Sequence, residues 1–308
     1  MTSFSIAHVT DIHISEKEKT WGTLARGADE LTRRCFAELN AIPDLDAVMI
    51  TGDVLDVATL VEVERFKSLL DILETPWHFI PGNHDGYIDS RSPQAYQPHE
   101  ALPLFDSRLA DPVPYAQNAR WSRPLKPGIH LIGLDSRLPD HWSGQVVAEQ
   151  IAWLKAELDS HQHETVLIAI HHPTFKLTKA NDREFFEHFI LKNGEEFENL
   201  LDGYANVKLV MAGHHHANRV LRHESRLHVN TASLSGYPCE YRLMRGAQEG
   251  DRWRITMSLH TVADTPTLEM ALRIADESDV GGWFDEDTTA WGRFCYGEEE
   301  DRDREDLL

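Results

Sequence analysis

Cysteine is scarce in this chain: the three copies, Cys35, Cys239 and Cys295, lie far apart along the 308 residues. They form no CxxC pair and no even-numbered framework of the kind that disulfide-rich secreted domains carry. The N-terminal stretch MTSFSIAHVTDIH also lacks the basic start and long apolar region of a secretory signal. We therefore expect a reducing, cytoplasmic compartment.

Long apolar runs and positive charge are lacking as well. No apolar stretch approaches the roughly 18 residues that a membrane span needs, so we expect no membrane contact. The chain has 30 Lys and Arg against 51 Asp and Glu, a formal net charge of −21, and nearly half of this excess lies beyond residue 275. An acidic surface repels nucleic acid, which makes a nucleic-acid partner unlikely. An anionic substrate would have to be attracted inside a site, for example by bound cations.

Six short apolar runs indicate strands that are buried on both faces. They cover residues 4–11, 46–53, 77–83, 129–135, 165–172 and 207–214. Helical patterns lie between them, at residues 30–42, 58–74, 146–160 and 182–201. This alternation predicts a layered α/β domain. After Arg226 shorter runs predict antiparallel strands, with the stretch QEGD (248–251) as a hairpin turn.

The chain divides by composition into a main domain, residues 1–265, and an acidic extension, residues 266–308. Within the main domain, residues 86–123 show no period, which is typical of a lid or cap insertion. Its Tyr87, Arg91, Tyr96 and Trp121 are candidate substrate contacts, and ordinary loop packing is the alternative for each. We expect the aromatic residues of the extension to pack on the body or on a neighbouring subunit, so a homo-oligomer is plausible. These aromatic residues are Trp283, Phe284, Trp291, Phe294 and Tyr296.

Five of the apolar runs end in polar motifs that carry Asp, Asn and His. The motifs are DIH (11–13), GDVLD (52–56), GNHD (82–85), HHP (171–173) and GHHH (213–216). In an open α/β sheet, ligands bind beyond the carboxyl ends of the strands, so we expect these side chains to meet at one edge. Oxygen ligands mixed with imidazoles, without thiolate, suit Mn, Fe, Zn or Co rather than a zinc finger.

The spacing within these motifs sharpens the expectation. In extended backbone, residues i and i+2 point to the same side, so Asp11 and His13 could approach one ion together. His214 and His216 would likewise share a side, and His215 would point away from the site. A set of this size suits two ions about 3.5–4 Å apart, bridged by one carboxylate. Each motif alone could also be a turn, a helix cap or a core histidine.

Taken in order, the motifs resemble the pattern D-x-H, G-D, G-N-H-[DE], H, G-H-x-H of the calcineurin-like metallophosphoesterases. The match extends over roughly residues 4–235. Within that family the chain is most similar to the bacterial class III cyclic nucleotide phosphodiesterases and glycerophosphodiesterases. The resemblance implies a four-layer α/β/β/α sandwich with a dinuclear metal site at the sheet edge.

The resemblance also implies which residues hold the two divalent ions. The first ion would be held by Asp11, His13 and His216, the second by Asn83, His171 and His214, and Asp53 would bridge them.

Three further side chains are candidates for the chemistry, and a fourth is interpreted as structural. By the same resemblance, His84 would contact phosphate and protonate the leaving oxygen, and Asn83 would also face the substrate. Asp85 would orient the ring of His84 or serve only as a turn residue. His172 would lie behind the ligands or face the substrate, and Asp56 is interpreted as a cap for the helix that begins near Ala58.

The implied activity is hydrolysis of small phosphodiesters, of the cyclic nucleotide or glycerophosphodiester type, by a metal-activated hydroxide. Two alternatives stay open. One is a phosphomonoesterase or nuclease of the same family. The other, from a different class, is a non-catalytic, metal-bound scaffold that binds protein partners.

Overall fold

The computed structural model describes residues 2–18, 20, 22–85, 120–138, 141–177, 189–278 and 290–308. Within these ranges no helix is long and apolar enough to cross a membrane. The three cysteines, which all fall within these ranges, are buried free thiols.

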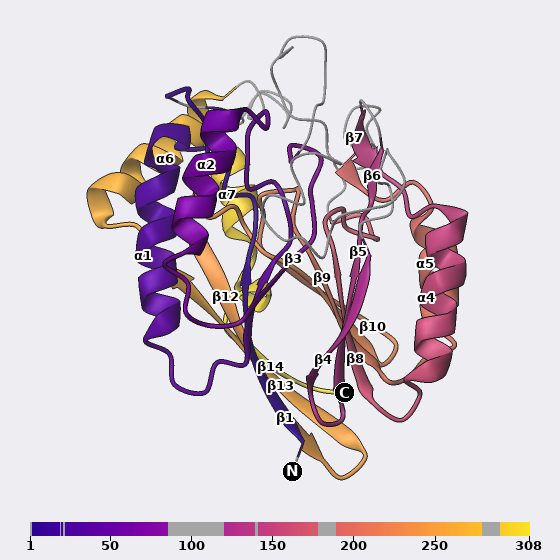
Figure 1. Ribbon diagram of the computed structural model, residues 1–308. Helices are drawn as coiled ribbons and strands as arrows, with labels where there is room; N and C mark the ends of the chain where they lie inside the picture. Colours follow the sequence, from indigo (N-terminus) through magenta and orange to yellow (C-terminus); the bar gives the residue numbers. More distant parts are fainter. Residues whose placement is uncertain are drawn as a thin grey trace.

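Two six-stranded mixed sheets lie face to face at the centre of the molecule (Figure 1). In order across the first sheet, the strands are Arg304–Leu307 (β14), Arg252–Thr261 (β13), Glu240–Glu249 (β12), Ser3–Val9 (β1), Ala47–Ile50 (β2) and Trp77–Phe79 (β3). Strands β1, β2 and β3 run parallel, and β12 joins β1 from the other side in antiparallel pairing. The first strand of the chain is therefore a central strand of this sheet.

The second sheet is parallel in its middle and antiparallel at both edges. Its strands, in order, are Arg219–His223 (β10), Arg226–Asn230 (β11), Val207–Ala212 (β9), Thr165–Ile170 (β8), Ile129–Leu134 (β5) and Trp121–Lys126 (β4). Strands β11, β9, β8 and β5 form the parallel part. A small two-stranded sheet, Arg137–Leu138 (β6) with His141–Gly144 (β7), follows β5.

Helices cover the outer face of each sheet, which confirms the predicted four-layer sandwich (Figure 1). Beside the first sheet lie Ala28–Asn40 (α1), Leu60–Leu70 (α2) and Thr265–Glu277 (α6). Beside the second sheet lie Ala148–Ser160 (α4) and Gly194–Leu201 (α5). Among the described residues, the other helical segments are Ala290–Tyr296 (α7) and the short 3-10 helices Ala25–Gly27 (η1) and Glu299–Asp301 (η6).

Strand β8 shows how the layers are packed. Leu167 and Ala169 belong to the large core cluster that is shared with the first sheet, whereas Val166, Ile168 and Ile170 belong to the cluster under α4 and α5. All five side chains are buried. Alternate residues of an extended strand point to opposite faces, so a strand covered on both faces must be apolar throughout.

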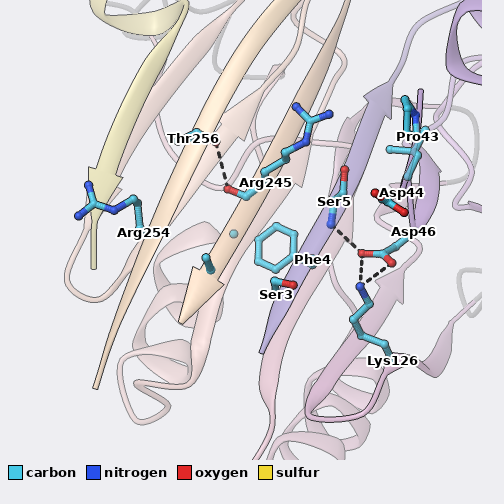
Figure 2. A pocket seen from close by; sticks show the side chains of 13 residues that line it. Ser3, Phe4, Ser5, Pro43, Asp44, Asp46, Lys126, Arg245, Arg254 and Thr256 are labelled. Carbon is cyan, nitrogen blue, oxygen red and sulfur yellow. Dashed lines mark hydrogen bonds and ion pairs between the residues drawn. The ribbon is translucent and has the colours of Figure 1, made fainter. Parts of the chain in front are cut away.

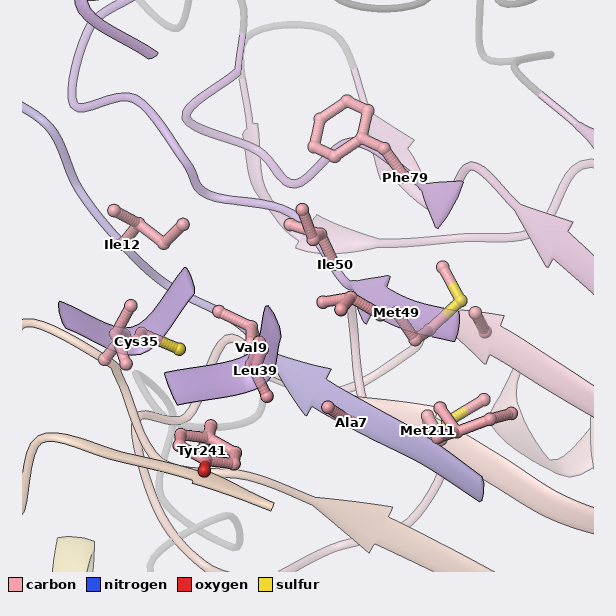
Figure 3. Packing of buried hydrophobic residues seen from close by; sticks show 14 of the residues in the cluster. Ala7, Val9, Ile12, Cys35, Leu39, Met49, Ile50, Phe79, Met211 and Tyr241 are labelled. Carbon is pink, nitrogen blue, oxygen red and sulfur yellow. The ribbon is translucent and has the colours of Figure 1, made fainter. Parts of the chain in front are cut away.

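The large cluster fills the space between α1, the first sheet and the second sheet (Figure 3). Leu39 of α1, Val9 of β1, Met49 and Ile50 of β2 and Met211 of β9 are all members of it. Each exposes 1% or less of its surface. This continuous packing holds the ends of strands from both sheets in fixed relation to one another.

Two predicted boundaries need correction. Residues 121–123 of the predicted lid belong to β4, where Trp121 is buried and its Nε1 donates a 2.8 Å hydrogen bond to the carbonyl of Phe79. Trp121 is thus a core residue rather than a substrate contact, and residues 86–119 lie outside the described ranges. The predicted helix 182–201 is also too long: among its described residues only Gly194–Leu201 (α5) are α-helical. Leu191 instead pairs with Gly144 in an isolated β-bridge.

The C-terminal extension packs against the body of the protein. Trp291 and Phe294 of α7 are buried beside Ala217 and Ala275, and β14 pairs with β13. The fully buried Arg242 of β12 donates to two backbone carbonyls of the extension, Asp301 at 2.8 Å and Arg302 at 3.2 Å. The expectation that its aromatic residues pack on the body is met by Trp291 and Phe294; Trp283 and Phe284 lie outside the described ranges. The boundary at residue 265 stays a prediction.

Candidate dinuclear metal centre

The five polar motifs follow five neighbouring strands. DIH, GDVLD and GNHD come after β1, β2 and β3 of the first sheet, and HHP and GHHH come after β8 and β9 of the second. Because each set of strands is parallel, the motifs of each sheet emerge at the same end, and packing of the two sheets joins the two sets. The structure brings all seven predicted ligands together, in overlapping groups with donor atoms close enough to share metal ions.

The first group consists of Asp11, His13 and His216, and all three side chains are buried. The Nε2 atoms of His13 and His216 lie 2.9 Å apart. Asp11 Oδ1 lies 3.5 Å from the His216 nitrogen and 3.9 Å from the His13 nitrogen. One carboxylate and two imidazoles thus converge on a single point.

The second group surrounds Nε2 of His171. Asn83 Oδ1 and Asp53 Oδ2 each lie 3.2 Å from this nitrogen. The ring of His214 lies beside it, with its centroid 5.1 Å from that of His171. His171 Nδ1 is 2.6 Å from the carbonyl of Thr51. If Nδ1 carries the proton and donates it to this carbonyl, the lone pair of Nε2 is turned toward the group, as metal-binding histidines usually require.

Asp53 lies between the two groups. Its Oδ2 contacts His171. One donor atom each of Asp53, Asp11 and His171 lies within 4.8 Å of the other two. Burial opposes ionisation, but His171 and neighbouring histidines hold the pKa of Asp53 well below its usual range. Burial also disfavours a charged His171, yet Asp53 and Asp11 outweigh it and raise the pKa of this histidine to about 9. The carboxylates of Asp53 and Asp11 thus favour positive charge at His171, whereas burial lowers the pKa of His13 to about 3.

Two observations show that these residues fit metal ions. The buried atom His214 Nε2, an imidazole nitrogen that can bind a cation, has no hydrogen-bond partner among the described residues. A buried polar atom without a partner costs about 1–3 kcal/mol, which an ion at His214 Nε2 would offset. Imidazole nitrogens, carboxylates and an amide oxygen are also the donor set that first-row divalent metals accept.

The backbone of the motifs is not extended. Five of the predicted ligands have positive φ angles between 49° and 67°, in the left-handed region. They are Asp11, His13, Asp53, His214 and His216. The prediction that His214 and His216 point to the same side assumed extended backbone, and that assumption was wrong. The two rings in fact belong to different groups, one with His171 and the other with Asp11.

The glycines in the motifs allow this close packing. Gly52 has a φ of 91°, and a Cβ there would overlap the backbone of Gly82. A Cβ on Gly213 would lie 2.5 Å from Asp11 Oδ2. Only glycine leaves room for this close approach, between two loops of the first sheet at Gly52 and between loops of the two sheets at Gly213.

His84 lies at the rim of the first group, where its ring centroid is 4.9 Å from that of His13. Its Nδ1 is 2.7 Å from the carbonyl of Asp56, and its amide donates to Asp53 Oδ1 at 2.7 Å. The Asp56 carbonyl, rather than Asp85, therefore orients the ring. The indole of Trp142 lies 5.5 Å from the His84 ring, a neighbour that no sequence motif indicated.

Of the two roles expected for Asp85, its hydrogen bonds fit the turn residue and not the group that orients His84. Its Oδ1 accepts from the amides of Val54 and Leu55, at 2.8 and 3.0 Å, and its Oδ2 accepts from the amide of Gly82 at 2.8 Å. Asp85 thus ties the loop after β2 to the loop after β3. Burial and the nearby charge of Asp53 raise its pKa to about 7, against the effect of the amide bonds.

Asp56 is also not the helix cap that we expected. Helix α2 begins at Leu60 and is capped by Thr59, whose hydroxyl accepts from the amide of Glu62. The buried carboxylate of Asp56 instead accepts hydrogen bonds from Ser15 and Lys17, each at 2.9 Å. It lies 4.0 Å from His84 Nδ1, next to the site.

His172 does not face a substrate. Its Nδ1 is 2.7 Å from the hydroxyl of Ser136 and its Nε2 is 3.0 Å from the carbonyl of Trp142, so both ring nitrogens have protein partners. The ring packs against His214, with centroids 4.4 Å apart. Of the two positions predicted for His172, these contacts fit the one behind the ligands, where its ring supports that of His214.

The middle histidine of the triplet, His215, packs between aromatic rings instead of joining either group. Its ring centroid lies 5.5 Å from that of Phe189 and 5.9 Å from that of Phe294 in the C-terminal extension. This agrees with its predicted exclusion from the ligand set.

A surface pocket of about 780 Å³ lies elsewhere, around the amino end of β1 (Figure 2). Two of its three cationic side chains pair with carboxylates: Lys126 Nζ lies 2.6 Å from Asp46 Oδ2, and Arg254 pairs with Glu249 at 2.7 Å. The pocket contains none of the predicted ligands.

Comparison with known proteins agrees with this architecture. Residues 4–218 match the family described as Calcineurin-like phosphoesterase. The chain is 29% identical over 214 residues to a 3′,5′-cyclic-nucleotide phosphodiesterase of Nostoc sp., covering 69% of this chain and 71% of that protein. It is 28% identical over 220 residues to a probable glycerophosphodiester phosphodiesterase of Arcobacter nitrofigilis, covering 68% and 71%.

A solved structure, a dimetal phosphatase from Danio rerio, shares the fold. Its TM-score is 0.63 at 17% identity, and the match covers 85% of this chain and 97% of that one. The sequence match extends over more than half of the chain and includes all five motifs. The chain therefore belongs to the calcineurin-like phosphoesterase family, whose members use dinuclear divalent metal sites.

Proposed function

We propose that this protein is a dinuclear-metal-dependent phosphodiesterase that hydrolyses small phosphodiesters of the cyclic nucleotide or glycerophosphodiester class. The observation that carries the proposal is the pair of ligand groups joined through Asp53, with His84 at their rim. The names of the two relatives, a cyclic-nucleotide phosphodiesterase and a probable glycerophosphodiester phosphodiesterase, support the choice of substrate class.

In this proposal Asp11, His13 and His216 hold one ion, and Asn83, His171 and His214 hold the other. Asp53 is shared between them. Divalent ions held there would supply Lewis acidity, lower the pKa of a bound water and offset the negative charge of the phosphate. Mn, Fe, Zn and Co all suit this donor set.

The chain's own residues would position and protonate the substrate. The Asp56 carbonyl engages Nδ1 of His84, so proton exchange with a substrate would use Nε2. We assign His84 to contact the phosphate and to give a proton to the leaving alkoxide, while the amide of Asn83 faces the same phosphate. A positioned acid of this kind contributes typically 10²–10⁴-fold to the rate.

The test is an assay of the full chain, stripped of metal and then supplied in turn with Mn²⁺, Zn²⁺, Fe²⁺ and Co²⁺. A bis-aryl phosphate and a mono-aryl phosphate are compared under the same conditions. We expect a higher kcat/KM for the diester. Cyclic AMP and glycerophosphoethanolamine, assayed next, separate the two diester classes.

The other outcomes identify the alternatives. A preference for the mono-aryl ester would support a phosphomonoesterase, and cleavage of single-stranded DNA would support a nuclease. No turnover with any of the four metals would support the non-catalytic scaffold. A cytoplasmic location and a homo-oligomer stay predictions from the sequence.

A further inference from the structure

The indole of Trp142 lies where the two sheets meet at the candidate metal centre. Trp142 belongs to β7, which together with β6 follows the carboxyl end of β5 in the second sheet (Figure 1). His84, whose ring centroid is 5.5 Å from that of Trp142, follows β3 of the first sheet. The side chain of Trp142 therefore extends from the second-sheet side of the centre to the first-sheet side.

The backbone around Trp142 is fixed to the HHP motif. The carbonyl of Trp142 lies 3.0 Å from Nε2 of His172. Gly144, two residues further on, packs directly against the same ring, since a Cβ there would lie 2.4 Å from ring atoms of His172. The carbonyl of Gly144 also accepts a 2.8 Å hydrogen bond from the amide of Lys192. The position of β7, and with it that of the indole, is thus set by the residues that carry the metal ligands.

Trp142 also differs from its neighbours in exposure. It is half-buried, whereas His84, His171 and His214 are buried. Part of Trp142 is therefore open to a ligand at the rim of the centre. An indole offers a large flat apolar surface, which packs best against other flat or apolar groups.

The place of the indole decides which part of a substrate it meets. In the proposed function, His84 gives a proton through Nε2 to the leaving oxygen of the phosphate ester. Because the indole lies beside His84, the organic group that carries this oxygen lies beside the indole. In a 3′,5′-cyclic nucleotide this group is a nucleoside with a flat base. In a glycerophosphodiester it is a small polar alcohol.

We propose that Trp142 binds the nucleoside of a cyclic nucleotide and makes the protein prefer this substrate class to glycerophosphodiesters. The inference rests on the proposed function, which leaves the choice between the two classes open. A base that stacks on an aromatic side chain typically gains roughly 5- to 150-fold in affinity. Glycerol has no flat face and gains little from the same contact.

The test compares three ligands of the metal-loaded full chain by titration calorimetry: AMP, glycerol 3-phosphate and inorganic phosphate. All three carry a phosphate, so the affinity of each organic ligand divided by that of inorganic phosphate isolates the contribution of its organic group. We expect Trp142→Ala to lower this ratio for AMP by roughly 5- to 150-fold and to leave the ratio for glycerol 3-phosphate unchanged.

Two further variants serve as controls. Trp142→Phe keeps an aromatic ring and should keep most of the AMP ratio. His163→Ala replaces an exposed histidine near the amino end of β8, at the opposite end of that strand from His171, and should match wild type with all three ligands. If Trp142→Ala does not fold, Trp142→Leu, which keeps bulk without an aromatic face, takes its place.

A displaced His84 would give a different result. His84 is assigned to the phosphate, which all three ligands share, so its displacement would weaken all three alike and leave both ratios unchanged. Unchanged ratios in Trp142→Ala would therefore overturn the proposal, even if every affinity fell. An equal fall of the ratios for AMP and glycerol 3-phosphate would overturn it as well, because the indole would then not select a nucleoside.

Turnover separates this inference from the proposed function. Wild type should hydrolyse cyclic AMP with a higher kcat/KM than glycerophosphoglycerol, and Trp142→Ala should narrow the difference through a higher KM for cyclic AMP. If wild type hydrolyses no phosphodiester, the proposed function fails. The affinity ratios need no turnover, so they still decide whether Trp142 contacts a nucleoside.

Discussion

His13 Nε2 and His216 Nε2 lie 2.9 Å apart, although 203 residues separate the two histidines in the sequence. His13 follows β1 of the first sheet and His216 follows β9 of the second. A cation bound by both rings would therefore join the two sheets at their carboxyl edge. We therefore expect the folded protein to be more stable when metal occupies the candidate centre.

Removal of metal should therefore destabilise the protein. An ion at 100- to 1,000-fold above its Kd contributes about 3–4 kcal/mol, which for a chain of this size corresponds to a drop of roughly 5–15 °C in melting temperature. Scanning calorimetry before and after chelation, and again after Mn²⁺ is restored, measures this. His216→Ala should show a smaller drop. An unchanged melting temperature after verified loss of metal would contradict the link.

Replacement of His84 should slow the reaction without emptying the centre. We expect His84→Ala to lower kcat by roughly 10²–10⁴-fold, because the leaving oxygen would lose its proton donor. Elemental analysis should still find two ions per chain. His163→Ala serves as the control and should match wild type. Full turnover in His84→Ala would remove this residue from the proposed chemistry.

Replacement of Asp85 should act through the structure. Asp85→Asn places an amide N–H₂ where the carboxylate now accepts from the backbone amides of Val54, Leu55 and Gly82. We expect a loss of about 1–3 kcal/mol in unfolding free energy, because at least one buried amide loses its acceptor. Urea denaturation of Asp85→Asn and wild type measures this difference in unfolding free energy. Stability equal to that of wild type would show that the amides find other acceptors.

Glu62 should make stability depend on pH. Burial raises the pKa of this carboxyl group from its ordinary 4.5 to about 7 in the folded protein. Between these two values the native state keeps a proton that the unfolded chain has lost. Stability therefore falls as the pH rises from 4.5 to 7, by up to about 3 kcal/mol.

Glu62→Gln should remove this dependence, because glutamine cannot ionise and can still accept the amide bonds of Val57 and Thr59. Urea denaturation at pH 5 and at pH 8 gives the comparison: relative to wild type, the variant should gain stability at the higher pH. Glu64→Gln, at an exposed position on the same helix, is the matched control. The same pH response in Glu62→Gln and wild type would rule out this role for Glu62.

Much of the fold could be predicted from the sequence, because its central strands are covered on both faces. Such strands are apolar at nearly every position, as in the run TVLIAI (Thr165–Ile170), and the first polar residue after the run marks its end. The gathering of the motifs at one edge followed from the parallel arrangement of these strands. The edge strands β10 and β14 were missed because they are short and rich in charged residues.

Side-chain orientation within the motifs could not be read from the pattern. The positive φ angles of His214 and His216 depend on the close approach of Gly213 to Asp11, a contact between residues about 200 positions apart. The partners of Asp85 are likewise backbone amides, which no sequence pattern marks. The group that orients His84 is also part of the backbone, the carbonyl of Asp56. Every residue type has such a carbonyl, so the sequence could not reveal it.

The central place of β1 in the first sheet has a consequence for synthesis on the ribosome. Its partner on one side, β2, follows within about 40 residues, but β12 on the other side pairs with it across more than 230 residues. At roughly 5–20 residues per second, the open edge of β1 waits about 12–50 seconds for that partner. During this time Asp11 and His13 also lack the histidines of the second sheet. Until β12 is made, the nascent chain therefore exposes one edge of this largely apolar strand, and we expect its yield to depend on chaperones that shield such edges.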